Sequence, residues 1–248
     1  MSCLNRRQFL ESTCLTAGAC LTWGSASAWG AVAPGVETKA APVITGEERN
    51  LQPDIWALEV NFKPLRLIRV DLPDARTGKT TPRMIWYIVY RVVNRPADGT
   101  SPAQSEEAAK RPIFVPEFTL VTEDEGAQKV YLDRVMPVAQ AAINKRERHH
   151  YKNSVEIVGP IPPITPLKAK LDKSLDGMAT WRGIDPATDH FKVYMTGFSN
   201  GYRTIAGPNG EEVVQRKTLV QQFWRPGDRF EQHEAEIRIV GAPQWIYR

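Results

Sequence analysis

The alternation of apolar and polar residues centres on one stretch, residues 83–94 (Arg-Met-Ile-Trp-Tyr-Ile-Val-Tyr-Arg-Val-Val-Asn). Eight of these twelve residues are β-branched or aromatic, and none is Gly or Pro, which is typical of a strand. Successive side chains of a strand point to opposite faces. One face would carry Met84, Trp86, Ile88, Tyr90 and Val92, and the other Ile85, Tyr87, Val89 and Val93. Because both faces are apolar, the pattern predicts a central strand covered above and below.

Most of the chain after residue 53 is predicted to form further strands separated by turns. Residues 56–71 favour one long strand, interrupted at Pro64 because proline has no N–H to donate to a ladder. Residues 190–196 alternate as a half-buried antiparallel strand does, and Gly207–Gly210 signals a hairpin turn. The other predicted strands are 113–122, 129–132, 154–158, 177–181, 217–224 and 234–240, with a short edge at 244–247. The longest predicted loops are 72–82 and 95–110.

One segment departs from the strand pattern. Its apolar residues recur at helical spacing, at Val135, Val138, Ala139, Ala142 and Ile143. Pro137 suits the first turn of a helix, and the basic residues that follow suit the negative C-terminal end. The sequence therefore predicts one helix at about residues 136–148, inserted among the strands.

About nine or ten strands and one helix predict an all-β fold, a β-sandwich. The order of three segments resembles a broad class of exported bacterial immunoglobulin-like proteins. These segments are Tyr90–Asn94, then Phe118–Val121 before an acidic turn, and then Gly177–Trp181 before a further strand. The resemblance covers about residues 55–240 and implies an immunoglobulin-like antiparallel β-sandwich. It implies no catalytic residues, because a shared fold does not carry an activity with it.

The first residues have the organisation of an export signal. The segment Asn5–Glu11 contains Arg6-Arg7-Gln8-Phe9-Leu10 and resembles the twin-arginine signal, although Asn5 and Glu11 depart from its usual residues. An uncharged stretch follows and ends in Ala26-Ser27-Ala28, which is typical of a cleavage site. We therefore expect a signal peptide at residues 1–28, a flexible tether at 29–53, a single β-sandwich domain at 54–248, and a periplasmic or other extracytoplasmic location. The exact cleavage site and lipidation of Cys20 stay open.

Composition and charge narrow the possible chemistry. The three cysteines all lie within the first twenty residues, so the mature chain would have no disulfide, thiolate metal site or cysteine nucleophile. The net charge of +4 is small and spread along the chain, which does not favour nucleic acid binding. The apolar run in the signal is too short to span a membrane. We expect no cofactor and no transmembrane span in the mature chain.

The sharpest catalytic candidate is Gly197-Phe198-Ser199-Asn200-Gly201. It matches the G-x-S-x-G elbow of serine hydrolases and resembles the elbow of polyester depolymerases and feruloyl esterases, with Ser199 as nucleophile and Asp228 and His233 as partners. An elbow must lead from a strand into a helix, whereas a strand and a hairpin turn are predicted after Gly201. The alternative is that the two glycines bound a bend between strands.

A metal site has little support in the sequence. The four histidines are His149, His150, His190 and His233, and they lack metal-ligand spacing. The favoured interpretation is a non-catalytic exported domain that binds another envelope protein or a glycan, or serves a structural role there, through an unpaired sheet edge or residues 160–166. The alternative function is a small serine hydrolase that uses Ser199.

Overall fold

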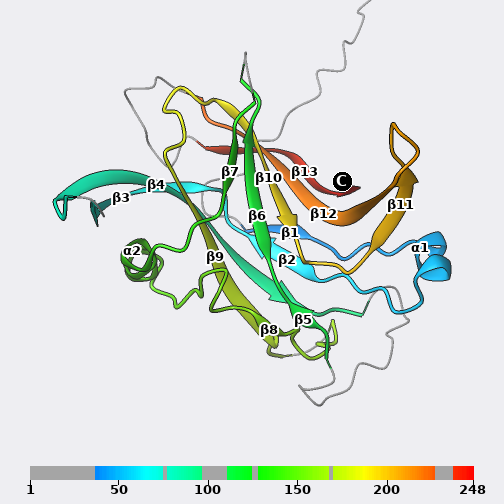
Figure 1. Cartoon of the computed structure of the whole chain (residues 1–248). Helices are drawn as coiled ribbons and strands as arrows, with labels where there is room; N and C mark the ends of the chain where they lie inside the picture. The colour runs from blue at the N-terminus through cyan, green and yellow to red at the C-terminus, as the bar shows by residue number, and fades with distance from the viewer. Residues whose placement is uncertain (1–36, 75–76, 97–110, 125–127, 168–169, 227–236) are drawn as a thin grey trace, which may run out of the picture.

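The computed structural model describes residues 37–74, 77–96, 111–124, 128–167, 170–226 and 237–248. Thirteen strands and two helices form within these residues, and all pairs of named strands are antiparallel. The strands gather into two main sheets (Figure 1). The prediction of an all-β sandwich is confirmed. In the described residues, no helix is long and apolar enough to cross a membrane.

The first sheet is built around β4 (Thr80–Val93), which contains most of the predicted central strand. On one edge, β3 (Arg66–Pro73) pairs with the first half of β4 and β2 (Glu59–Phe62) with its end, while β9 (Ser174–Arg182) pairs along the other edge. The short β1 (Thr38–Ala40) extends the sheet beyond β2. The predicted interruption near Pro64 is therefore real, and it divides one long strand into β2 and β3.

The second sheet is built around β12 (Glu212–Trp224). One edge of β12 pairs with β13 (Arg238–Tyr247), and the other pairs with β11 (Tyr202–Ala206) and then with β10 (His190–Thr196). The sheet continues through β6 (Glu117–Thr122) to β7 (Val130–Leu132). A third, two-stranded sheet joins β5 (Ile113–Phe114) to β8 (Gly159–Pro160).

The main core lies between the two large sheets. One face of β4 contributes Trp86, Ile88, Tyr90 and Val92 to it, and the second sheet contributes Phe118, Phe191, Val193, Leu219 and Phe223. The rings of Trp86 and Phe191 meet edge to face, with centroids 5.2 Å apart. Ile85, Tyr87 and Val89 enter a second cluster on the opposite face of the first sheet. The prediction that β4 is covered on both faces is confirmed.

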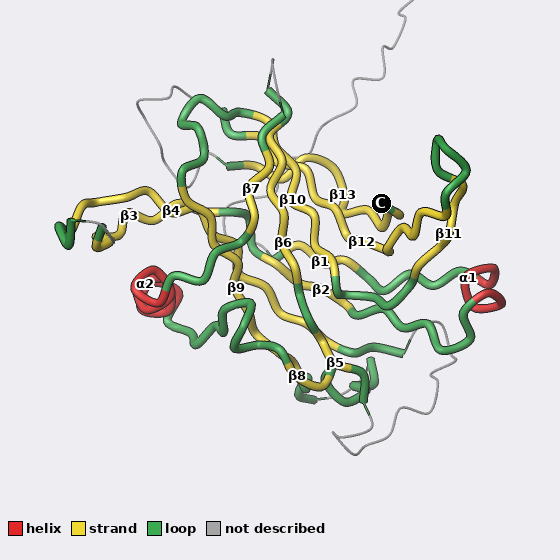
Figure 2. The backbone as a smooth tube through the Cα atoms, viewed as in Figure 1, coloured by secondary structure: helices red, strands yellow, loops and turns green. Residues whose placement is uncertain are grey.

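The second cluster is covered by α2 (Pro137–Glu147), which confirms the predicted helix. Figure 2 shows α2 in cross-section outside the first sheet. Its buried residues are Ala139, Gln140 and Ile143, whereas Val138 is 47% exposed. The assignment of Val135 and Val138 to the buried stripe was therefore wrong, since Val135 lies before the start of α2 and is 41% exposed, and the helix turns Ala139 toward the sheet instead of Val138.

The C-terminal end of α2 is held by Glu147. Its carboxylate accepts hydrogen bonds from Lys63 Nζ at 2.8 Å, Arg66 Nη1 at 2.9 Å and the Tyr87 hydroxyl at 2.8 Å. Burial raises the pKa of Glu147, but the hydrogen bonds from Lys63 and Tyr87 and the positive charge of Arg66 outweigh burial and leave the pKa below its ordinary value. Burial and the same carboxylate raise the pKa of Tyr87.

The described part of the predicted tether, residues 37–53, is folded, which corrects that prediction. Strand β1 pairs with β2, and Ala40 enters the main core. Helix α1 (Gly46–Leu51) begins with a capping box, in which the Thr45 hydroxyl accepts from the Glu48 N–H and the Glu48 carboxylate accepts from the Thr45 N–H. Hydrogen bonds from Lys217 of β12 to the Glu48 carboxylate hold α1 against the second sheet.

Three further predicted boundaries need correction. Residues 154–158 form a turn instead of a strand, because the Asn153 carboxamide oxygen accepts from the Val155 and Glu156 N–H groups at 3.0 Å each. The loop predicted at 72–82 is largely hairpin, since β3 runs to Pro73 and β4 begins at Thr80. The predicted strands 234–240 and 244–247 merge in β13, and residues 234–236 lie outside the described residues.

Candidate functional site

The G-x-S-x-G motif forms a corner between β10 and β11, and no helix follows it. Gly197 has φ +87°, and a Cβ at this position would lie 2.0 Å from the carbonyl oxygen of Val115. Only glycine fits such a close backbone approach at a positive φ. The prediction of a bend between two strands is confirmed at Gly197–Gly201.

Ser199 is 8% exposed, and its hydroxyl both donates and accepts a hydrogen bond. Its hydroxyl donates to the Trp56 carbonyl oxygen at 2.6 Å and accepts from the Gly201 N–H at 3.0 Å. The neighbouring Asn200 side chain accepts from the Trp56 N–H at 2.7 Å. These bonds attach the corner to the segment that leads into β2. The proposed partners Asp228 and His233 lie outside the described residues.

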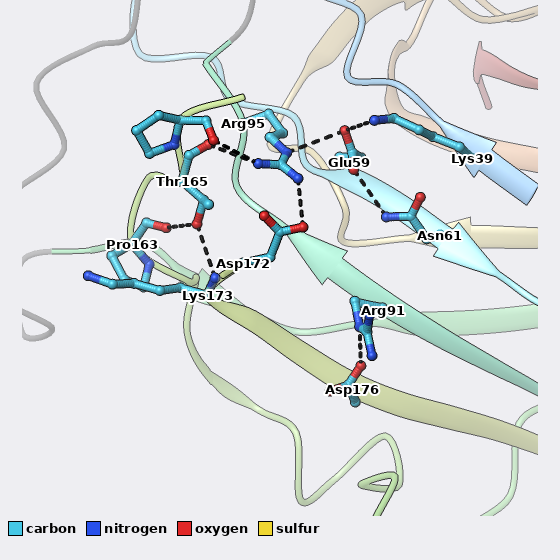
Figure 3. Close-up of polar contacts among 11 residues, drawn as sticks. Lys39, Glu59, Asn61, Arg91, Arg95, Pro163, Thr165, Asp172, Lys173 and Asp176 are labelled. Carbon is cyan, nitrogen blue, oxygen red and sulfur yellow. Dashed lines mark hydrogen bonds and ion pairs between the residues drawn. The ribbon is translucent and has the colours of Figure 1, made fainter. Parts of the chain in front are cut away.

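A second cluster of polar side chains lies where β2 and β4 meet residues 160–167 and 170–172 (Figure 3). The buried Glu59 carboxylate lies 2.6 Å from Lys39 Nζ and 3.6 Å from Arg95 Nε. Arg95 also pairs with Asp172 at 2.7 Å and donates to the Pro166 carbonyl oxygen at 3.0 Å. Each charge in this network has a partner, so the network fastens chain segments together instead of presenting a vacant charge.

The same contacts bear on residues 160–166, one of the two expected contact surfaces. The Asn94 side-chain amide donates to the Pro162 carbonyl oxygen at 2.9 Å, and the backbone carbonyl oxygen of Asn94 accepts from the Thr165 N–H at 2.8 Å. Ile161, Pro162 and Thr165 are buried. Much of this segment therefore packs inside the protein, which favours a different surface for contact with a partner.

Of the described histidines, His149 and His190 make contacts at the surface, and His150 is exposed. His149 Nε2 lies 3.2 Å from Asp176 Oδ2, and Asp176 Oδ1 accepts from Arg91 Nε at 2.8 Å. His190 stacks on Trp224 with ring centroids 6.3 Å apart. His233 lies outside the described residues. Across the described ranges, no group of three or more His, Cys, Asp or Glu side chains is arranged to hold a metal ion.

The structure brings together three arginines that the sequence pattern did not single out. Arg83, Arg134 and Arg182 line a cavity of about 520 Å³, with Leu72 and Asp74 among its other lining residues. We call this cavity the arginine pocket. It lies where the β3–β4 hairpin leaves the body of the sandwich, a hairpin that projects to one side in Figure 1.

Strand register places two of these arginines on one face. Arg182 of β9 pairs with Ile85 of β4, and Arg83 lies two residues before Ile85 on the same strand. Both therefore share the α2-side face of the sheet with Ile85. Arg134 reaches the pocket from the segment before α2, where its N–H donates to the Thr180 carbonyl oxygen at 2.9 Å. The three residues lie far apart in sequence, so only the sheet register could have revealed the pocket.

The chain was also compared with protein-family models, curated proteins and solved structures, and none of the three comparisons finds a match.

Proposed function

We propose that this chain is an exported, non-catalytic β-sandwich domain that acts in the cell envelope by binding another component. The proposed export rests on the twin-arginine motif in residues 5–11 and the Ala-Ser-Ala sequence that ends at Ala28. We also propose that the domain belongs to the immunoglobulin-like class. The two-sheet architecture supports a β-sandwich, of which the immunoglobulin-like fold is one type.

One observation carries the non-catalytic part. The Ser199 hydroxyl lies in a strand-to-strand corner, with the Trp56 carbonyl oxygen as its acceptor and the Gly201 N–H as its donor. A nucleophilic serine needs its proton within reach of a general base and its oxygen exposed to substrate. A buried hydroxyl that donates to a backbone carbonyl supports a structural role instead.

Labelling with a fluorophosphonate probe and turnover of a short-chain aryl ester test this proposal. We expect neither labelling nor turnover in the wild type. Ser199→Ala should lower the free energy of unfolding by about 1–3 kcal/mol, because it leaves the buried Gly201 N–H without an acceptor and removes one of the two hydrogen bonds to the Trp56 carbonyl oxygen. Ser174→Ala, at the start of β9, is the matched control. Labelling that disappears in Ser199→Ala and persists in Ser174→Ala would establish the hydrolase and overturn the proposal.

Export is tested separately by replacing Arg6 and Arg7 with lysine. Wild-type protein should accumulate outside the cytoplasm with a mature N-terminus at Trp29, and the double variant should remain inside as the longer precursor. Equal export of the wild type and the double variant would refute export by the twin-arginine route. It would not affect the conclusion about Ser199.

A further inference from the structure

We propose that the arginine pocket binds a phosphomonoester group, carried by a small molecule or by a lipid headgroup. This inference rests on the proposed binding function and assigns a ligand class to it. The argument combines the placement of Arg83, Arg134 and Arg182 with the charge and the apolar wall of the cavity they line.

The first step is that the three guanidinium groups have no partner in the described part of the chain. No hydrogen bond or ion pair joins their side chains to another described residue. Several other arginines do have a carboxylate partner, as in the Arg66–Glu147 and Arg91–Asp176 contacts. Single exposed arginines are common and need no ligand. Three that converge on one cavity repel one another, and a bound anion would remove that repulsion.

The second step is the charge balance. Asp74 is the carboxylate among the pocket's lining residues, and its Oδ1 accepts from the Thr77 N–H at 2.9 Å within the hairpin turn. Among the described residues that line the pocket, three positive charges against one negative charge leave two positive charges. A phosphomonoester carries a charge of about −1.5 to −2 near neutral pH, so one phosphomonoester group matches the pocket.

The third step is the choice of arginine. Guanidinium groups present paired N–H donors in a planar fork, which bind phosphate oxygens two at a time. Donors from three separate chain segments can surround the oxygens of one phosphoryl group. Their backbones are well fixed, since Arg182 follows the fully buried Trp181 and Arg83 precedes the fully buried Ile85 by two residues. Fixed positions of this kind lower the cost of ordering the site on binding.

The fourth step is the wall of the pocket, which is partly apolar. Leu72 and Met84 line the cavity, and Leu72 lies on the same face as Arg83 because it pairs with Thr81, two residues earlier on β4. A volume of about 520 Å³ is within the range of small-ligand sites and exceeds what a phosphoryl group alone would fill. The pocket thus suits a phosphorylated organic molecule better than a bare inorganic ion.

Isothermal titration calorimetry with glycerol 3-phosphate tests the site in the purified protein. We expect saturable binding that Arg83→Gln and Arg182→Gln each weaken by about tenfold or more, the usual effect of losing a charged hydrogen-bonding group. Arg182→Lys should also weaken binding, since it keeps the charge but loses the fork. The matched control is Arg69→Gln, because Arg69 is an exposed arginine on the same hairpin that does not line the pocket.

Several results would overturn the inference. These are no saturable binding, binding that Arg83→Gln and Arg182→Gln leave unchanged, or binding that Arg69→Gln weakens equally. Thermal unfolding of each variant identifies losses that come from misfolding, and Arg134→Gln supplies an independent variant on a different segment.

A vesicle experiment distinguishes the two sources of the group. Sedimentation with vesicles containing phosphatidic acid, reversed by glycerol 3-phosphate and absent with phosphatidylcholine alone, would identify a lipid headgroup. Binding of glycerol 3-phosphate without vesicle binding would identify a soluble ligand. Neither the calorimetry nor the vesicle sedimentation depends on Ser199. Fluorophosphonate labelling of Ser199 together with intact glycerol 3-phosphate binding would therefore refute the proposed function but not the phosphate site.

Discussion

Replacing Lys217 with methionine should detach the N-terminal segment from the second sheet. Lys217 lies in β12 and is 2% exposed. Its Nζ donates to the Val43 carbonyl oxygen at 2.6 Å and to both Glu48 carboxylate oxygens, at 2.6 and 2.7 Å. The Tyr247 hydroxyl donates to the same carboxylate. Burial raises the pKa of Glu48, but the hydrogen bonds from Lys217, Tyr247 and the Thr45 backbone outweigh burial and lower it.

The expected magnitude follows from this burial. Removing one partner of a buried ion pair costs about 3–5 kcal/mol, because the remaining charge is left without compensation. Glu48 is partly exposed, with 15% of its side chain accessible, and α1 has no buried residue. The carboxylate can therefore regain water if α1 lifts away, so we expect a loss of about 3 kcal/mol, at the lower end of this range. A six-residue helix is not stable alone, so α1 should unfold once released.

Lys192 provides a matched control. Lys192 and Glu123 form an ion pair of the same length as that of Lys217 and Glu48, 2.6 Å, but the Lys192 side chain is 32% exposed against 3% for Lys217. Lys192→Met should cost less than about 1 kcal/mol, as exposed pairs do. Urea unfolding followed by tryptophan fluorescence gives both values, and limited proteolysis reports cleavage within residues 37–53. Equal losses in the two variants, or an uncleaved N-terminal segment in Lys217→Met, would refute the reasoning.

Further predictions concern Glu147 and the glycines. Glu147→Gln should lower the unfolding free energy measured in urea by about 2–4 kcal/mol, because it leaves the partly exposed cations of Lys63 and Arg66 without their buried carboxylate. The lowered pKa of Glu147 means that its contribution is complete above pH 4.5, the ordinary glutamate value, and is lost as pH falls through the folded-state pKa. The difference between wild type and Glu147→Gln should therefore shrink in urea titrations below pH 4.5 and persist at neutral pH. Gly197→Ala should cost at least about 3 kcal/mol, since a positive φ and a backbone clash add together. Gly210 also has a positive φ, +80°, but a Cβ added there would meet nothing within 4 Å. Thermal unfolding of Gly210→Ala should therefore show a loss of only about 1–2 kcal/mol in the free energy of unfolding.

Sequence periodicity predicted the centre of the fold because local pattern and burial agree there. In β4 the two-residue alternation assigns Trp86 to one core cluster and Tyr87 to the other, as observed. The turn at residues 154–158 shows where the same pattern fails. Val155 and Ile157 alternate with polar residues, but the Asn153 side chain caps two backbone N–H groups and closes a turn. Local hydrogen bonding by asparagine competes with strand formation.

The N-terminal segment was missed for a different reason. Residues 37–53 have no apolar periodicity, and their position depends on contacts with β2 and with Lys217, far along the chain. One local signal was present, because Thr45 and Glu48 have the spacing of a capping box. The arginine pocket had no comparable signal. The positions of Arg83 and Arg182 follow from the register of β4 and β9, which side-chain patterns do not determine, and Arg134 is placed by a backbone hydrogen bond to Thr180 of β9.

The G-x-S-x-G motif can be accounted for residue by residue without catalysis. Gly197 is required where a Cβ would strike the Val115 carbonyl, and a Cβ at Gly201 would press against Lys217 at 3.1 Å. Ser199 and Asn200 satisfy backbone groups of the segment that leads into β2. A side chain that is needed to close a corner between strands is not available to attack a substrate in the same geometry. Three arginines without a partner among the described residues line the arginine pocket together, which is why the proposed function is binding and why the pocket is the place to test it.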